Sequence, residues 1–338
     1  MKHINIALFV VHKGCPHMCS FCNQRSISGS QKDITAADVH EAAQTAIKSL
    51  SEQQASGGEI AFFGGSFTMV ERGYMLSLLE AAHEYIRNRI FKGIRISTRP
   101  DGISREICEI LKKYGVTAVE LGAQSLDDRV LLLNERGHTA KQVEDAVKML
   151  KEYGFETGLQ MMTGLYGSED ADSIETAEKI IALAPETVRI YPTVVIKGTR
   201  LCELMEKGEF IPKGIPETVD LCARLIPMFE NAGIKVIRVG LHSGGGVEQG
   251  FAGGAYHPAL RELCEGRIYY NHALGELEKL GQGCYELAVS PREISKMTGQ
   301  KKQNLLRLHE KGFECTVRGR EGLSKYEVEI HKGDSNDS

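Results

Sequence analysis

Three cysteines stand close together near the start of the chain, in the segment Gly14-Cys15-Pro16-His17-Met18-Cys19-Ser20-Phe21-Cys22. Thiolates are soft ligands that bind iron–sulfur clusters and zinc. Three thiolates on a four-iron cluster leave one iron without a protein ligand, and a catalytic centre needs such an open position. The spacing C-x3-C-x2-C therefore predicts a 4Fe–4S cluster held by Cys15, Cys19 and Cys22.

Zinc is the alternative occupant of this motif, with His12 or His17 as a further ligand. Zinc ligands usually come as two separated pairs, and the chain has no second close pair of cysteines. A simple electron carrier would need a fourth cysteine nearby. The other cysteines stand alone, which is typical of buried apolar side chains. They are Cys108, Cys202, Cys222, Cys264, Cys284 and Cys315.

The motif follows the first of several short apolar runs, which alternate with helical patterns. Continuous apolar runs are typical of strands buried on both faces, and strand–helix alternation indicates a parallel sheet. The predicted fold is α/β, a partial (β/α)6 TIM-like barrel with a small C-terminal α+β region; an open doubly wound sheet is the alternative. The expected strands are Ile4–Val11, Glu59–Phe63, Ile94–Thr98, Thr117–Gly122, Phe155–Met161, Val188–Val195 and Ile234–Gly240.

Polar segments end several of these strands, at the edge where ligands bind in parallel α/β folds. Two adjacent glycines after the second strand let backbone approach a ligand closely. An arginine and an aspartate follow the third strand, with a local ion pair as the alternative to a ligand contact. The segments are Phe62-Phe63-Gly64-Gly65-Ser66-Phe67-Thr68, Ser97-Thr98-Arg99-Pro100-Asp101-Gly102, Glu120-Leu121-Gly122-Ala123-Gln124-Ser125 and Arg189–Leu201.

The cysteine motif, with an aromatic residue before its last cysteine, resembles that of the radical S-adenosylmethionine (radical SAM) superfamily. The resemblance implies that SAM binds the open iron through its amino and carboxylate groups. One electron, from a donor such as ferredoxin or flavodoxin, then cleaves SAM to methionine and a 5′-deoxyadenosyl radical that abstracts hydrogen. The implied SAM-binding residues are Phe21, Gly64, Gly65, Ser66, Thr98, Gln124, Ser125, Arg189 and Val195.

Within this superfamily the chain most resembles the radical SAM domain of the Elongator catalytic subunit, over about residues 5–240. That family modifies the wobble uridine of tRNA, so the resemblance implies tRNA or another RNA as substrate. The chain departs from the family in its narrower cysteine spacing. It also has no lysine for acetyl-CoA in Ser56-Gly57-Gly58-Glu59, and the residues after 240 lack the pattern of an acetyltransferase-like domain.

The segment from Ser290 to Arg320 carries eight Lys and Arg against three Glu, whereas the whole chain has a formal net charge of −4. A basic module can neutralise phosphates, so we expect RNA contact here, with a solvated helix face as the alternative.

The chain is expected to divide into three regions. They are a radical SAM partial barrel at 1–240, a glycine-rich and helical extension at 241–289, and a small basic region at 290–332.

Other classes of protein fit the sequence less well. No apolar run approaches the length of about 18 residues that a membrane span needs, and no signal peptide is evident, so the expected location is the cytoplasm. A porphyrin-like or other small substrate is one alternative, but Gln24 stands where the oxygen-independent coproporphyrinogen oxidase family has a further cysteine. The alternative outside enzymes is an RNA-binding module stabilised by an iron–sulfur cluster or zinc.

Overall fold

The computed structural model describes residues 4–10, 15–16, 18–23, 33–241 and 245–333. The chain divides into two compact units. The first unit comprises residues 1–214 and 228–256, and the second comprises 215–227 and 257–338. None of the helices in these described ranges is both long and apolar enough to cross a membrane.

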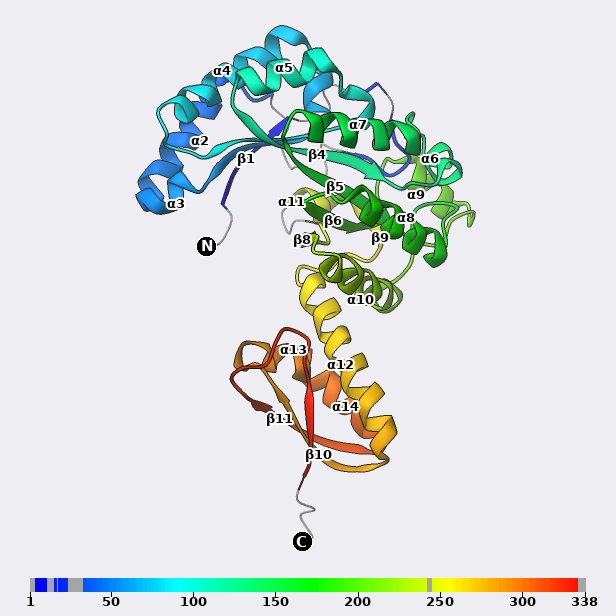
Figure 1. Ribbon diagram of the computed structural model, residues 1–338. Coiled ribbons are helices and arrows are strands. Elements are labelled where there is room, and N and C mark those ends of the chain that lie inside the picture. Colours follow the sequence, from blue (N-terminus) through cyan, green and yellow to red (C-terminus); the bar gives the residue numbers. More distant parts are fainter. Residues whose placement is uncertain (1–3, 11–14, 17, 24–32, 242–244, 334–338) are drawn as a thin grey trace. The chain divides into compact units, whose positions relative to one another are not determined.

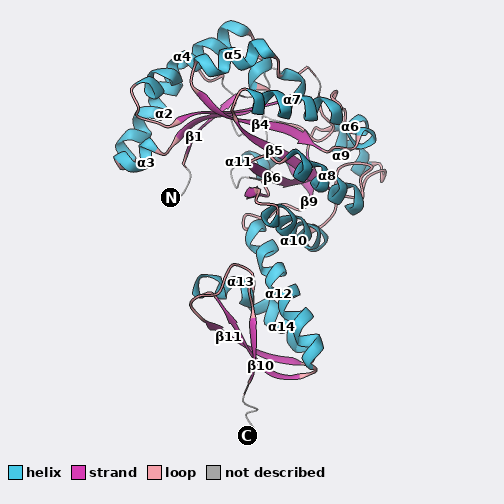
Figure 2. Ribbon diagram, in the orientation of Figure 1, coloured by secondary structure: helices cyan, strands magenta, loops and turns pink. Residues whose placement is uncertain are grey.

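The first unit is built on a seven-stranded parallel sheet in the order β1-β2-β3-β4-β5-β6-β8. The sheet is curved, and helices cover its outer face (Figure 1, Figure 2). This architecture confirms the predicted α/β partial barrel. The strands are β1 (Asn5–Val10), β2 (Glu59–Gly64), β3 (Gly93–Thr98), β4 (Val116–Gln124), β5 (Glu156–Thr163), β6 (Thr187–Pro192) and β8 (Lys235–Val239).

The helices of the first unit pack one apolar side against the sheet. α7 buries Val143, Ala146, Val147 and Leu150, which recur at the spacing of a single helical face. Its first turn is closed by a capping box at Thr139, which satisfies backbone N–H groups at the helix start. The helices are α2 (Ala36–Ser49), α3 (Glu52–Ser56), α4 (Arg72–Arg87), α5 (Arg105–Lys113), α6 (Asp128–Leu133), α7 (Ala140–Glu152), α8 (Asp170–Leu183), α9 (Arg200–Glu206) and α11 (Gly245–Gly250), with short η1 (Phe67–Met69) and η2 (Pro100–Gly102).

The expected strand Val188–Val195 is divided in two. β6 ends at Pro192, and the chain then enters β7 (Val194–Ile196), which pairs antiparallel with β9 (Phe251–Gly254) in a separate small sheet. Proline has no N–H to continue a ladder, which favours a break at this point. The prediction of one continuous strand was therefore wrong, although both parts are extended.

The second unit has its own three-stranded sheet in the order β11-β10-β12. The central strand pairs parallel with β11 and antiparallel with β12. The core contains the fully buried side chains of Tyr269, Leu287, Met297 and Leu308. The elements are α12 (Leu260–Leu280), β10 (Gly283–Val289), η3 (Pro291–Glu293), α13 (Ile294–Thr298), η4 (Gln300–Lys302), α14 (Gln303–Glu310), β11 (Phe313–Gly319) and β12 (Glu329–Lys332); α10 (Ile215–Asn231) begins in this unit.

Candidate metal and cofactor site

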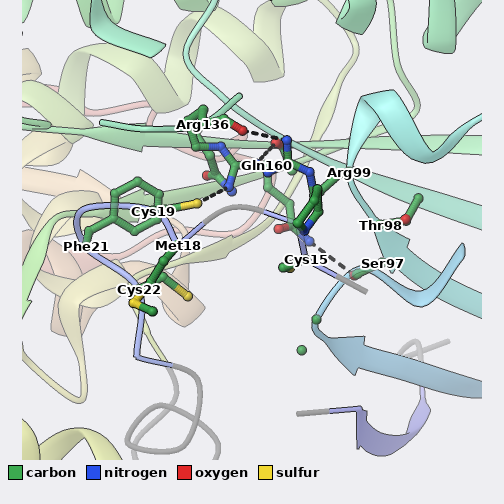
Figure 3. Close-up of a pocket in the computed structure, with 15 residues that line it drawn as sticks. Cys15, Met18, Cys19, Phe21, Cys22, Ser97, Thr98, Arg99, Arg136 and Gln160 are labelled. Carbon is green, nitrogen blue, oxygen red and sulfur yellow. Dashed lines mark hydrogen bonds between the residues drawn. The ribbon is translucent and has the colours of Figure 1, made fainter. Parts of the chain in front are cut away.

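A cavity of about 370 Å³ lies in the first unit, where β2, β3 and β4 end and the cysteine segment follows β1 (Figure 3). Short connections at this edge of a parallel sheet bring together segments that are far apart in the sequence. The lining residues are Cys15, Pro16, Met18, Cys19, Phe21, Cys22, Gly64, Gly65, Ser97, Thr98, Arg99, Gly122, Gln124, Arg136 and Gln160.

All three predicted cysteine ligands line this cavity. Desolvation raises the pKa of the Cys15 thiol, and Cys19 adds to the rise, while Arg99 and Arg136 oppose it. In the described ranges no three Cys, His, Asp or Glu side chains are already gathered as a metal site. The alternative zinc ligands His12 and His17 lie outside the described residues.

Two buried arginines face the cysteines. Arg136 donates from Nη1 to the Cys19 Sγ at 3.0 Å and from Nη2 to the Gly122 carbonyl at 2.6 Å. Arg99 donates from Nη2 to the Arg136 carbonyl at 2.5 Å and forms two bonds of 2.9 Å with Asp101. The expected alternative, a local Arg99–Asp101 ion pair, is therefore present. Arg99 itself lines the cavity (Figure 3).

Each of these arginines keeps one buried N–H group without a hydrogen-bond partner in the part of the chain that is described. The groups are Arg99 Nη1 and Arg136 Nε, and the Gln124 Oε1 acceptor is also buried and unpartnered. Buried polar atoms are normally hydrogen-bonded, so such unmet groups around one cavity indicate a polar ligand. Two donors and one acceptor match the carboxylate and amino groups of an amino acid. The lining residues therefore fit SAM and a thiolate-bound cluster.

A β-bulge in strand β4 determines the position of Gln124. The pairing of β4 with β5 shifts register between Gly122 and Gln124, and Gln124 itself has a φ of +66°. Such bulges redirect side chains at the ends of strands. The bulge places the Gln124 side chain on the wall of the cavity.

Gly64 is required by the close approach of β1 and β2. Its φ is +110°, and a Cβ there would lie 2.7 Å from the Val10 carbonyl oxygen. The Gly65 N–H donates to that same oxygen at 2.6 Å. Both glycines line the cavity, but this N–H is already engaged within the protein.

Phe21 and Thr98 also line the cavity, whereas four other implied SAM contacts are not among its lining residues. Ser66 is buried, and its hydroxyl bonds to the Thr98 hydroxyl at 2.8 Å. The Ser125 hydroxyl accepts from the Asp127 N–H at 3.1 Å. Val195 packs in a buried apolar cluster that includes Cys19 and Phe21.

Arg189 belongs to a buried charge network on the inner face of the sheet. It forms two hydrogen bonds with Glu120, of 2.6 and 2.8 Å. Gln160 connects this pair to the cavity, since its Nε2 donates to Glu120 at 3.0 Å and to the Ser97 hydroxyl at 3.3 Å. Arg95 is also close, with Nη1 3.5 Å from Glu120. Arg189 thus acts on the cavity wall through Glu120 and Gln160.

The sequence interpretation missed Arg136 and Gln160. Arg136 lies in the loop after α6, not at a strand end, and reaches Cys19 across 117 positions of sequence. Gln160 is inside β5, where the pattern showed only an apolar run. A polar residue within such a run is the one signal that could have identified Gln160.

The profile of the Radical SAM superfamily matches residues 9–180, and that of the Radical_SAM C-terminal domain matches residues 185–270. The chain therefore belongs to the radical SAM superfamily. It is an enzyme of this class, and the predicted cofactors, a 4Fe–4S cluster and SAM, agree with that membership.

Curated relatives support the predicted likeness to the Elongator catalytic subunit. The tRNA uridine(34) acetyltransferase of Methanocaldococcus infernus is 36% identical over 133 residues, which are 37% of this chain and 24% of the relative. Elongator complex protein 3 of Homo sapiens is 29% identical over 190 residues, 50% of this chain and 35% of the relative. The chain thus matches about a quarter to a third of the length of these relatives.

Solved structures share the fold. The archaeal Methanocaldococcus infernus Elp3 with an N-terminal deletion has a TM-score of 0.62 at 23% identity, and the match covers 79% of this chain and 64% of that chain. Streptococcus suis SuiB has a TM-score of 0.50 at 15% identity, covering 70% of this chain and 49% of that chain. These likenesses agree with the parallel sheet described above.

Proposed function

We propose that the chain cleaves SAM at a 4Fe–4S cluster held by Cys15, Cys19 and Cys22. The observation that carries this proposal is one cavity that is lined by all three cysteines and by two buried arginines with unpartnered N–H groups. The cluster, when bound, supplies the electron that cleaves SAM to methionine and a 5′-deoxyadenosyl radical. We place the reaction in the cytoplasm, with a ferredoxin or flavodoxin as the electron donor.

The chain's own residues have distinct roles in this proposal. Arg99 and Arg136 bind the SAM carboxylate, because they are buried donors held in place by hydrogen bonds within the protein. Gln124 accepts a hydrogen bond from the amino group or a ribose hydroxyl. Phe21, with Val195 behind it, supplies the apolar surface for adenine. Gly64, Gly65 and Thr98 form the wall, while Ser66, Ser125 and Arg189 hold that wall in position.

RNA is the proposed substrate, and tRNA is the best candidate. Support comes from relatives named as tRNA uridine(34) acetyltransferases and from the basic segment 290–320. Acetyl transfer is not part of the proposal, because the matched region covers only 24% and 27% of those relatives. The reaction proposed here is radical modification of a nucleoside.

The cluster can be tested by anaerobic reconstitution of the wild type, Cys22→Ala and the control Cys284→Ala. Cys284 is partly buried and belongs to the second unit. We expect about four irons per chain in the wild type and control, and far less iron in Cys22→Ala. After reduction, only the iron-loaded proteins should form 5′-deoxyadenosine from SAM. One zinc per chain without iron uptake would contradict the proposal.

The substrate is tested separately by mass spectrometry of total tRNA nucleosides from cells with and without the gene. A nucleoside that disappears in the deletion and returns with the wild-type gene, but not with Cys22→Ala, would support tRNA modification. An unchanged nucleoside profile, together with no stimulation of SAM cleavage by tRNA, would reject RNA as the substrate. A small-molecule substrate would then be the better interpretation.

A further inference from the structure

The second unit contains a separate cavity of about 290 Å³, lined by α12, α13, α14 and the start of α10. Four cationic side chains are on its wall, with Glu262 as the carboxylate. The cations are Arg267, Lys296, Lys301 and Arg307. Cations thus outnumber carboxylates among the lining residues, and any that have no carboxylate partner would attract an anion.

Two of these cations are already paired. Lys296 lies 2.8 Å from Glu265 and 2.7 Å from Glu293. Arg267 pairs with Asp220, yet its Nε is buried without a hydrogen-bond partner in the described part of the chain. Burial and the like charge of Arg307 both lower the pKa of Arg267. A bound anion would therefore relieve repulsion between two guanidinium groups.

The other cations are not compensated. Arg307 and Lys301 make no ion pair with any described residue, and neither does the neighbouring Lys302. Both lysines are exposed. Lys301 and Arg307 line the cavity, and Lys302 is next to Lys301 in the chain. Lys and Arg side chains bind the phosphates of a nucleic-acid backbone, so these unpaired cations suit such a ligand.

The two lysines are held in an unusual backbone conformation. Lys301 and Lys302 have φ values of +51° and +61°, in a left-handed region that lysine rarely adopts. Asn304 follows the turn, and its Nδ2 donates to the carbonyls of Gly266, Lys296 and Met297 at 2.9, 3.1 and 3.0 Å. The end of the turn is thus tied to both α12 and α13.

We propose that the Gly299–Lys302 turn and the adjacent cavity bind the sugar–phosphate backbone of single-stranded RNA. KH modules use a comparable device, because their Gly-x-x-Gly loop clamps about four nucleotides through the backbone. Double-stranded RNA is recognised over about 16 base pairs, a much larger surface than one turn and one cavity provide. The inference rests on the proposed function only in taking RNA as the partner.

The test uses the full-length chain and a fluorescein-labelled, single-stranded oligoribonucleotide of about eight nucleotides, longer than a KH-type footprint. The double variant Lys301→Asp/Lys302→Asp reverses two charges, and aspartate tolerates left-handed backbone better than most residues. Lys301→Asn/Lys302→Asn removes the charges in the same conformation. Arg292→Asp is the matched control, an exposed cation of the same unit that is not among the cavity-lining residues.

Fluorescence anisotropy should show at least about tenfold weaker binding for the Asp variant and little change for Arg292→Asp. For the Asn variant, the slope of log affinity against log salt should fall by about 1.4, as expected for two lost contacts with a single strand. Equal binding of a duplex of the same sequence, or an Asp variant that binds like the wild type, would overturn the inference.

Failure of this inference can be distinguished from failure of the proposed function. SAM cleavage without substrate should be unchanged in all three variants. If the Asp variant loses oligonucleotide binding while tRNA nucleosides are unaffected by gene deletion, the RNA site stands and tRNA modification fails. If nucleosides change but the Asp variant binds RNA normally, the modification stands and this site is wrong.

Discussion

The two cavities hold their positive charges in opposite ways. In the first unit, Arg99 and Arg136 are buried, Arg99 is held by hydrogen bonds to Asp101 and the Arg136 carbonyl, and Arg136 by one to the Gly122 carbonyl. In the second unit, Lys301 and Lys302 are exposed and make no ion pair with a described residue. Fixed, desolvated charges select a small ligand by geometry, whereas exposed charges attract a polyanion over the Debye length.

This difference predicts that substitutions in the first unit act through structure and geometry, and that those in the second act through charge and salt. The two units should also differ in how much stability they lose when a charged side chain is removed. A buried ion must keep its partner, because the desolvation penalty of an uncompensated charge is large. An exposed cation can be removed with little effect on folding.

The largest expected effect is that of Glu120→Ala. Glu120 is buried and binds Arg189 twice, with Gln160 and Arg95 beside it. Its loss leaves buried arginine charge uncompensated, so the free energy of unfolding should fall by about 3–5 kcal/mol. Urea unfolding followed by circular dichroism measures this. Lys141→Ala, which breaks an exposed pair with Asp145, is the control and should change little. Equal losses in the two variants would contradict the comparison.

A smaller effect is expected from the titration of His138. Burial, with Arg136 and Arg99 nearby, lowers the pKa of His138 to about 4 from 6.5, while the hydrogen bond with the Ala123 carbonyl and the charge of Asp101 oppose this shift. Between these pH values the unfolded chain binds a proton that the folded chain does not. Stability is therefore complete above pH 6.5 and falls as the pH is lowered toward 4, by about 3 kcal/mol in all.

Urea midpoints at several pH values between 7 and 4 measure this loss, with His138→Gln as the comparison because glutamine does not titrate. The variant should lose less stability over this range than the wild type. If the two proteins lose stability in parallel, His138 is not the group responsible.

Arg136→Met tests whether geometry controls the first cavity. It removes a guanidinium that lines the cavity. We therefore expect SAM affinity, measured by anaerobic equilibrium dialysis, to fall at least about tenfold, or 1.4 kcal/mol. Iron content is measured in parallel, since Arg136 also donates to Cys19. Arg105→Met, an exposed arginine at the start of α5, is the control. Unchanged affinity in an iron-replete Arg136→Met protein would show that this arginine does not contact SAM.

The smallest expected effect is that of Arg307→Gln on tRNA binding. Loss of one phosphate contact with a single strand should reduce the slope of log affinity against log salt by about 0.7. Filter binding over a salt series measures this slope, and SAM cleavage without RNA should be unchanged. A slope equal to that of the wild type would remove Arg307 from the RNA-binding surface.

The sequence predicted the sheet well, because each buried parallel strand is a continuous apolar segment that can be recognised without any long-range information. Thr117–Gly122 was expected and Val116–Gln124 is observed, an error at the ends alone. The break at Pro192 was missed, since strand exchange between sheets depends on the distant β9. The division at residues 240 and 290 stays a prediction, while the compact second unit also includes residues 215–227 of α10.

The sequence by itself determined the class of chemistry, because Cys15, Cys19 and Cys22 lie within one short loop and need no long-range contact to share a cavity. Only the tertiary structure decided what surrounds them. Arg136 reaches Cys19, and Gln160 reaches Glu120, through the closeness of strand ends and loops in a parallel sheet. Which cations of the second unit remain unpaired was likewise decided by folding, since an ion pair depends on distance in space and not on spacing along the chain.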